Sequence, residues 1–159
     1  MSIAWDDPSC PVSRYFKVKD ALYLPQWKRL ATPDDGLTYQ GMIALEDLFA
    51  RMDQVRDFLG VPIIVHCAYR PPGYNALVGG AKGSCHMARI DEGVKLAAVD
   101  FHAEVEQVGQ AEGCDVVKDA LKPRLEAFGL RMEDNGELAT WVHLDTRPVR
   151  AGGHRVFKP

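Results

Sequence analysis

Two histidines and one aspartate, each next to small or apolar residues, constrain this chain more than any other feature. His86 lies in a loop of small residues, Asp100 lies in an apolar run, and His143 lies in the segment Trp-Val-His-Leu-Asp. A carboxylate inside an apolar strand is costly unless it is paired or binds a metal ion. Two imidazoles and one carboxylate form a three-ligand zinc site that leaves the fourth position to water. The sequence therefore predicts a fold that brings His86, Asp100 and His143 together around Zn²⁺.

Composition and charge limit the kinds of partner that this chain is expected to bind. The chain has 159 residues, of which 47% are hydrophobic and 26% charged, as expected for one globular domain over residues 1–159. An irregular lead-in is expected over residues 1–13 and a surface tail over residues 147–159. The net charge of −3 gives no electrostatic case for binding nucleic acid. No apolar run is long enough to span a membrane, and the N-terminus lacks the pattern of a signal peptide, so synthesis in the cytoplasm is expected.

The period of the apolar residues divides the chain into helices and strands. A repeat of three and four residues marks amphipathic helices, and short β-branched or alternating runs mark strands. We expect helices over residues 38–59 and 115–128, the second kinked by Pro123, and strands over 15–18, 61–65, 96–101, 130–133 and 138–145. The strand at 61–65 is expected to be covered on both faces. Asp134-Asn135-Gly136 predicts a hairpin between the last two strands.

Two other motifs suggest different chemistry. The glycine-rich segment from Gly79 to Gly83 resembles a phosphate-binding loop, but it lacks the Gly-Lys-Ser/Thr ending and no long helix is expected after it. Close backbone packing beside His86 is the simpler interpretation. Cys85 precedes His86 directly, which allows a thiol nucleophile beside a base; the alternative is a small buried residue that supports the loop. The four cysteines are expected to be reduced.

Several short motifs, taken together, resemble the M15 zinc D-Ala-D-Ala peptidases, and in particular the branch found in bacterial cell-wall enzymes and phage endolysins. The resemblance extends from about Tyr15 to Arg147. It rests on the segments Ala-Tyr-Arg-Pro-Pro-Gly-Tyr-Asn from Ala68, Val-Gly-Gly-Ala from Val78, Ser-Cys-His-Met from Ser84 and Trp-Val-His-Leu-Asp from Trp141. It implies an α+β fold in which a small antiparallel sheet carries the zinc site and packs against helices, as in the hedgehog and DD-peptidase fold.

The spacing of the metal ligands departs from the family pattern. Ser84 and His86 match the start of the family's Ser-x-His-x-x-Gly-x-Ala-x-Asp motif, and Ala98-Val99-Asp100 matches its end, but Asp100 follows His86 by fourteen positions. In the family motif the aspartate follows more closely. We expect the additional residues to form a loop over 88–95, which leaves Asp100 on its strand. Asp91 within the loop is the alternative ligand, and His102 is a spare ligand on the strand face of Asp100.

The resemblance also suggests roles for other residues. Many relatives have an acidic residue three positions before the last histidine, but this chain has Thr140 there. Glu137 is the preferred general base, although six residues of regular strand would separate it from His143 by about 20 Å. Asp145 and Glu133 remain alternatives. Arg70 matches the family arginine that stabilises a substrate carbonyl or carboxylate. Ser84 is expected to bind substrate or hold its loop, and Trp141 to line the pocket or pack.

The resemblance implies a zinc peptidase that hydrolyses peptidoglycan stem peptides, either as a D-Ala-D-Ala carboxypeptidase or as an endolysin-type endopeptidase. The expected partner is a peptidoglycan peptide, with no nucleic acid and no membrane. A protein made in the cytoplasm would reach the cell wall after release, as phage endolysins do. The alternative function is a non-catalytic zinc-binding module that recognises cell-wall peptide or a protein partner. A cysteine hydrolase that uses Cys85 and His86 is a third hypothesis.

Overall fold

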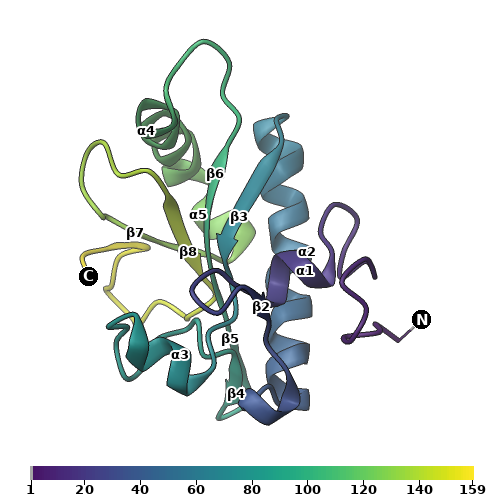
Figure 1. Cartoon of the computed structure of the whole chain (residues 1–159). Coiled ribbons are helices and arrows are strands. Elements are labelled where there is room, and N and C mark those ends of the chain that lie inside the picture. The colour runs from purple at the N-terminus through teal and green to yellow at the C-terminus, as the bar shows by residue number, and fades with distance from the viewer. Residues whose placement is uncertain (1) are drawn as a thin grey trace.

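Helices and short strands alternate along the chain, giving a mixed α+β fold (Figure 1). The computed structural model describes residues 2–159. The helices are α1 (Val18–Leu22), α2 (Tyr39–Leu59), α3 (Pro72–Leu77), α4 (Gln110–Leu121) and α5 (Leu125–Phe128), with 3-10 turns η1 (Pro33–Asp35) and η2 (Lys122–Arg124). The strands are β1 (Tyr23–Leu24), β2 (Arg29–Leu30), β3 (Ile63–Cys67), β4 (Arg89–Asp91), β5 (Val94–Leu96), β6 (Ala98–Ala103), β7 (Arg131–Glu133), β8 (Val142–Asp145) and β9 (Val156–Phe157).

A five-stranded sheet in the order β3-β6-β8-β7-β9 forms the centre of the molecule. Neighbouring strands are antiparallel, except that β9 runs parallel to β7. Asp100 on β6 lies directly opposite His143 on β8. Because side chains alternate between the two faces of a strand, this register puts both residues on one face of the sheet. The expected α+β class with a small, mainly antiparallel sheet is confirmed.

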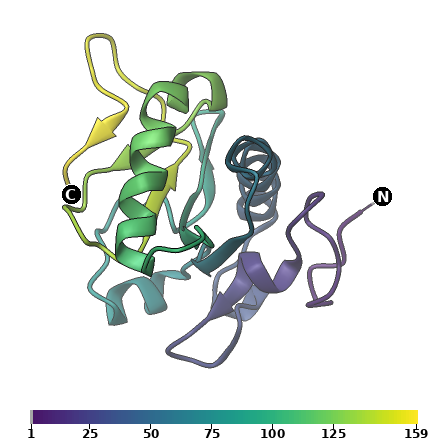
Figure 2. The same ribbon diagram turned by 90° about the horizontal axis from the view of Figure 1, so that it is seen from above.

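The opposite face of the sheet is apolar and belongs to the hydrophobic core. Val99 and Phe101 on β6 and Val142 and Leu144 on β8 are fully buried there, together with the inward side chains of the helices. Figure 2 shows α2 and α4 as separate helices at the sides of the sheet. One face of each central strand therefore stabilises the fold, which leaves the other face available for polar residues.

The longest helix, α2, has the ends that its sequence predicts. The Thr38 hydroxyl accepts a hydrogen bond from the backbone N–H of Gly41, as an N-cap should. Gly60 ends the helix in the left-handed conformation, with φ of 69°. No helix among residues 2–159 is long and apolar enough to cross a membrane.

The residues between His86 and Asp100 form a second small element rather than an irregular loop. Strands β4 and β5 pair as an antiparallel hairpin that turns at Glu92 and Gly93. The hairpin packs against the start of α2, where the backbone oxygen of Ala88 lies close to Gly41. Asp100 therefore remains on the central strand β6 despite the long spacing, and Asp91 lies on the exposed hairpin.

The contact between α2 and this hairpin leads to a stability prediction. A Cβ atom at Gly41 would lie 2.8 Å from the Ala88 backbone oxygen, whereas a Cβ atom at Gly113 in α4 would find ordinary contacts at 3.6 Å. We expect Gly41→Ala to lower the free energy of unfolding by about 1–3 kcal/mol because backbone must move. The matched Gly113→Ala change should leave it unchanged or raise it by up to about 1 kcal/mol. Urea unfolding of both variants tests this, and equal shifts would contradict it.

Three predictions of secondary structure were wrong in position or type. The strand expected over 61–65 is β3, which lies at the sheet edge with Ile64 42% exposed, so it is not covered on both faces. The expected strand at 15–18 is one bridge between Pro11 and Lys17, followed by α1. Helix α4 begins at Gln110 rather than at Asp115, whose carboxylate pairs with Lys118. Pro123 does interrupt the helical segment, at η2.

The largest corrections concern the C-terminal third of the chain. Strands β7 and β8 do pair, but β8 begins at Val142, so a long loop over residues 134–141 replaces the tight hairpin. Leu138 in this loop has a positive φ of 59°, which a strand does not allow. The segment expected to be a surface tail contributes strand β9 to the sheet. Glu137 and the 134–141 loop therefore lie outside the strand that carries His143.

Candidate metal centre and active site

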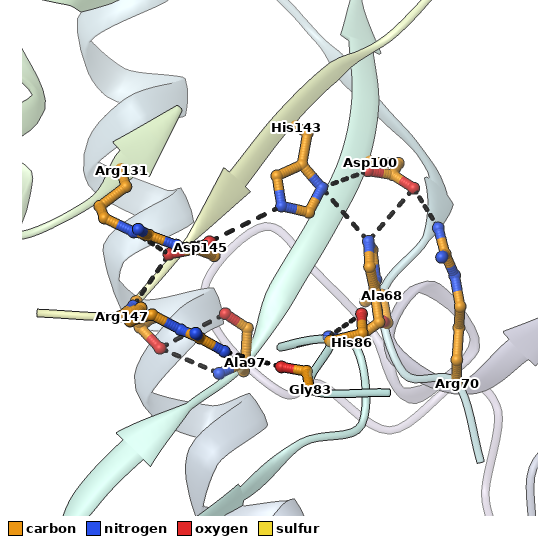
Figure 3. Close-up of polar contacts among 12 residues, drawn as sticks. Ala68, Arg70, Gly83, His86, Ala97, Asp100, Arg131, His143, Asp145 and Arg147 are labelled. Atoms are coloured by element: carbon orange, nitrogen blue, oxygen red, sulfur yellow. Dashed lines mark hydrogen bonds and ion pairs between the residues drawn. The ribbon is translucent and has the colours of Figure 1, made fainter. Parts of the chain in front are cut away.

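His86, Asp100 and His143 meet on the polar face of the sheet (Figure 3). One ligand atom from each of them lies within 4.8 Å of the others. The separations are 3.2 Å from Nε2 of His86 to Oδ2 of Asp100, 3.3 Å from Nε2 of His86 to Nδ1 of His143, and 2.7 Å from Nδ1 of His143 to Oδ1 of Asp100. The three residues predicted as metal ligands are therefore brought together.

These distances agree with the dimensions of a zinc site. A tetrahedral zinc ion with ligands at 2.0–2.1 Å separates its ligand atoms by about 3.3 Å. The two separations that involve His86 are already close to this value. The third separation, 2.7 Å between His143 and Asp100, is a hydrogen bond that a metal ion would replace. Three protein ligands of the types histidine, histidine and aspartate leave a fourth position for water or substrate.

The backbone sets the orientation of the His86 ring. Its Nδ1–H donates to the carbonyl oxygen of Ala68 at 2.6 Å, so the lone pair lies on Nε2, which faces Asp100 and His143. The backbone N–H of Arg70 donates to the His86 oxygen at 2.8 Å, which joins this loop to the segment that follows β3. Burial lowers the pKa of His86, despite the opposing effect of Asp100, so the ring is neutral, as a metal ligand requires.

His143 and Asp100 form a charged pair in the metal-free protein. Burial alone would lower the pKa of His143, but hydrogen bonding to Asp100 and the carboxylate of Asp145 raise it to about 9. Burial alone would raise the pKa of Asp100, but His86 and His143 hold it far below its usual range. At neutral pH a proton therefore occupies the Nδ1 position of His143 that a metal ion would take.

Asp145 supports the other side of the His143 ring. Its Oδ2 lies 3.8 Å from Nε2 of His143, and Arg131 donates to both of its oxygens at 2.9 and 2.7 Å. The backbone N–H of Arg147 donates to Oδ1 at 2.9 Å. A carboxylate behind a ligating histidine fixes the ring and increases its basicity. Because its oxygens are bound in this way, Asp145 supports the ring and is a poor candidate for a mobile base.

The three candidate ligands line an open cleft of about 620 Å³ that also includes Arg70, Ser84, Glu133 and Trp141. Nη2 of Arg70 lies 2.6 Å from Oδ2 of Asp100, so a guanidinium adjoins the metal position. Ser84 Oγ accepts from the backbone N–H of His86 at 3.2 Å, which supports the loop-holding interpretation of this residue. The Trp141 side chain is 39% exposed in the cleft wall. Arg70, Ser84 and Trp141 thus all lie where a substrate could reach them.

The glycine-rich segment forms one wall of the cleft. The Asn75 amide donates to the oxygen of Ala81 at 3.0 Å, and a Cβ atom at Gly80 would lie 2.0 Å from Oδ1 of Asn75. A side chain at position 80 would therefore require the Asn75 amide to move. The structure supports the packing interpretation of this segment.

Other predicted residues lie outside the triad. Glu137 is exposed and lines a different cavity, beside Asp115 and Lys118. It does not line the cleft that contains the triad, because the 134–141 loop directs it toward α4, where the N–H of Leu138 donates to Asp115. His102 shares the face of Asp100, but its Nδ1 lies 2.6 Å from Nε2 of His66.

Glu133 is the alternative base that does line the cleft. Arg131 on β7 lies opposite Asp145 on β8, and Glu133 follows Arg131 by two residues. Its side chain is therefore on the same face of the sheet as Arg131, Asp145 and His143. Among residues 2–159 it has no ion-pair partner within 4.0 Å.

Cys85 lacks the properties of a nucleophile. The residue is 5% exposed and packs with Leu96 and Ala98. Burial raises the pKa of its thiol, and the charge of Arg147 offsets this only in part. Since the thiolate is the reactive form, these surroundings favour the structural interpretation of Cys85.

Two functional candidates were missed in the sequence. Arg131 and Arg147 both line the cleft and both bind Asp145. A signal existed for Arg131, because Arg131 and Glu133 alternate with apolar residues in Leu-Arg-Met-Glu, which marks a strand with one polar face. Arg147 had no such signal, since its position depends on the turn after β8.

Comparison with known proteins gave one result. A family model described as Peptidase M15 matches residues 28–145, which is most of the chain and includes all three predicted ligands. No curated protein and no solved structure showed a significant match.

Proposed function

The chain belongs to the peptidase M15 family, and from this we propose that it is a zinc-dependent peptidase that hydrolyses peptide bonds in peptidoglycan stem peptides. The observation that supports this best is the meeting of His86, Asp100 and His143 in an open cleft. The expected resemblance to this family is confirmed. The small sheet with helices packed on its apolar face supports a fold of the DD-peptidase type, shared with the hedgehog signalling domain.

His86, Asp100 and His143 would hold the zinc ion, with Asp145 behind His143. Bound zinc would supply Lewis acidity, which lowers the pKa of water and polarises a carbonyl group. Arg70 donates from its guanidinium to the carbonyl oxygen as negative charge develops there. In this role it would exchange its present partner, Asp100, for the substrate.

We assign proton transfer to Glu133 rather than to Glu137. Glu133 lies between the two cavities and lines both the cleft of the triad and the cavity beside α4, whereas Glu137 lines only the cavity beside α4. Glu133 also shares a face of the sheet with His143. In this role, a carboxylate oxygen of Glu133 accepts a proton from the attacking water molecule and returns it to the amine that leaves. Trp141 and the glycine-rich wall would position the peptide on either side of the scissile bond.

The proposal is tested by incubating the purified protein with peptidoglycan and identifying the released fragments by mass spectrometry. Release of terminal D-alanine indicates a carboxypeptidase, whereas cleavage within the stem or the cross-link indicates an endopeptidase. Stoichiometric zinc binding without any cleavage would instead support the non-catalytic binding module. Cleavage that survives chelation but not alkylation would support the cysteine hydrolase.

Zinc binding should depend on pH because of the proton on His143. The pKa of His143 is about 9 in the metal-free protein, and that of His86 is lowered, so binding releases one proton near neutral pH. Apparent zinc affinity should rise about tenfold per pH unit below pH 9 and level off above it. Competition with a chelator at pH 6, 7 and 8 measures this. An affinity that is constant over this range would contradict the charged His143–Asp100 pair.

The same pKa shift predicts the stability of the metal-free protein. The pKa of folded His143 exceeds the ordinary value of 6.5, so protonation stabilises the fold. This contribution is complete below pH 6.5 and disappears as the pH rises through about 9. Zinc should remove this dependence, since it replaces the proton.

A further inference from the structure

Three arginines line the cleft, and two of them are neutralised within the protein. Arg70 pairs with Asp100 at 2.6 Å, and Arg131 forms a two-point contact with Asp145. Arg147 has no carboxylate within 4.0 Å of its guanidinium among residues 2–159. The third arginine of the cleft therefore carries a positive charge that no described carboxylate offsets.

The guanidinium of Arg147 is held in place, but not all of its hydrogen-bond donors have a partner. Its Nη2 donates to the oxygen of Gly83 at 2.7 Å, which fixes the side chain against the glycine-rich wall. Its Nε is buried and has no hydrogen-bond partner. A guanidinium has five N–H donors, and leaving a buried donor unpaired costs about 1–3 kcal/mol. Because Nε is buried, a ligand in the cleft would meet the terminal N–H groups of the guanidinium, and a carboxylate, which accepts two parallel bonds, fits these best.

Arg70 and Arg147 lie on opposite sides of the metal ligands (Figure 3). Arg70 approaches Asp100 from the β3 side of β6, whereas Arg147 follows the end of β8, four residues beyond His143. Four residues of chain span at most about 14 Å. A peptide whose scissile bond lies at the metal centre could therefore reach Arg147 with a group only a few residues from that bond.

We propose that Arg147 binds a carboxylate of the substrate, and so selects peptides that have an acidic group near the scissile bond on the side away from Arg70. This inference rests on the proposed peptidase function and specifies its substrate class. The carboxylate can be a side-chain or branch acid within the peptide, or the acid at the peptide's C-terminus. Both present the same two oxygens to the guanidinium.

The test compares amidated forms of one cleaved peptide. Wild-type protein is assayed on the free-acid peptide, on a form with its internal acid amidated and on a form with its C-terminal acid amidated. We expect one amidation to lower kcat/KM at least tenfold, which identifies the carboxylate bound. Arg147→Gln, which removes the charge but keeps a polar side chain, should reduce this acid-to-amide ratio toward one.

Two controls separate recognition from structure. Arg150→Gln removes the same charge from an exposed residue that does not line the cleft and should keep the wild-type ratio. A merely structural role of Arg147 would lower cleavage of all peptides equally and leave the ratio unchanged, which would overturn the proposal. Equal cleavage of the acid and both amides by wild-type protein would also overturn it while leaving the peptidase function intact. Absence of cleavage of every peptide would contradict the proposed function itself, and this inference with it.

Discussion

Replacing His143 with alanine is expected to abolish tight zinc binding and to lower peptide hydrolysis by at least about 10³-fold. Metal-ion stabilisation of a transition state is worth several kcal/mol, and each 1.36 kcal/mol is about tenfold in rate. The change leaves only two of the proposed ligands, His86 and Asp100. It also removes the 2.7 Å hydrogen bond to Asp100, although Asp100 keeps its contact with Arg70. Zinc content and kcat/KM are the quantities to measure.

His102→Ala is the matched control for this prediction. His102 lies on the strand face of Asp100, two residues away, but it pairs with His66 instead of joining the triad. Its removal should keep one zinc ion per chain and change hydrolysis by less than about threefold. Loss of zinc in His102→Ala with retention in His143→Ala would show that the triad is assigned to the wrong residues. Circular dichroism of both variants establishes that each has folded.

Replacing Glu133 with glutamine should lower kcat by about 10²–10⁴-fold while zinc remains bound, because loss of a general base has an effect of this size. Glutamine has the shape of glutamate but cannot accept the proton. Glu137→Gln makes the same chemical change outside the cleft and should have little effect on kcat. Single-turnover hydrolysis and zinc content measured together distinguish loss of the base from loss of the metal.

The opposite pattern, with Glu137→Gln inactive and Glu133→Gln active, would contradict the assignment. It would mean that the 134–141 loop turns back over the cleft when substrate binds. Activity unchanged in both variants would leave the zinc site as proposed but would exclude both glutamates as the base.

Local patterns in the sequence were sufficient to predict the parts of the fold that depend on nearby residues. Helix α2 has an uninterrupted apolar stripe, a threonine N-cap and a glycine at its end, and the structure reproduces it closely. The three candidate ligands could be singled out because a histidine and an aspartate within apolar strands need a partner. Their meeting across β6 and β8 follows from strand alternation once the two strands pair.

The errors arose where long-range pairing overrides local signals. Asp134-Asn135-Gly136 is a strong turn signal, but Leu138 and Asp115 hold the 134–141 loop against α4 instead of closing a hairpin. Strand β9 has only two residues, and it forms because β7 offers an unpaired edge. The hairpin between His86 and Asp100 is stable through its packing on Gly41, a contact between segments far apart in the chain. None of these contacts has a local pattern that predicts it.

Hydrolysis measured as a function of bound zinc tests the proposed zinc centre most directly. Chelator-treated protein receives zinc in small steps, and both zinc per chain and the rate of peptide cleavage are recorded at each step. We expect no cleavage without metal, a linear rise with bound zinc, and a plateau at one zinc ion per chain. Full cleavage by metal-free protein, or no cleavage once one zinc ion is bound, would contradict the assignment of His86, Asp100 and His143 as a catalytic zinc centre.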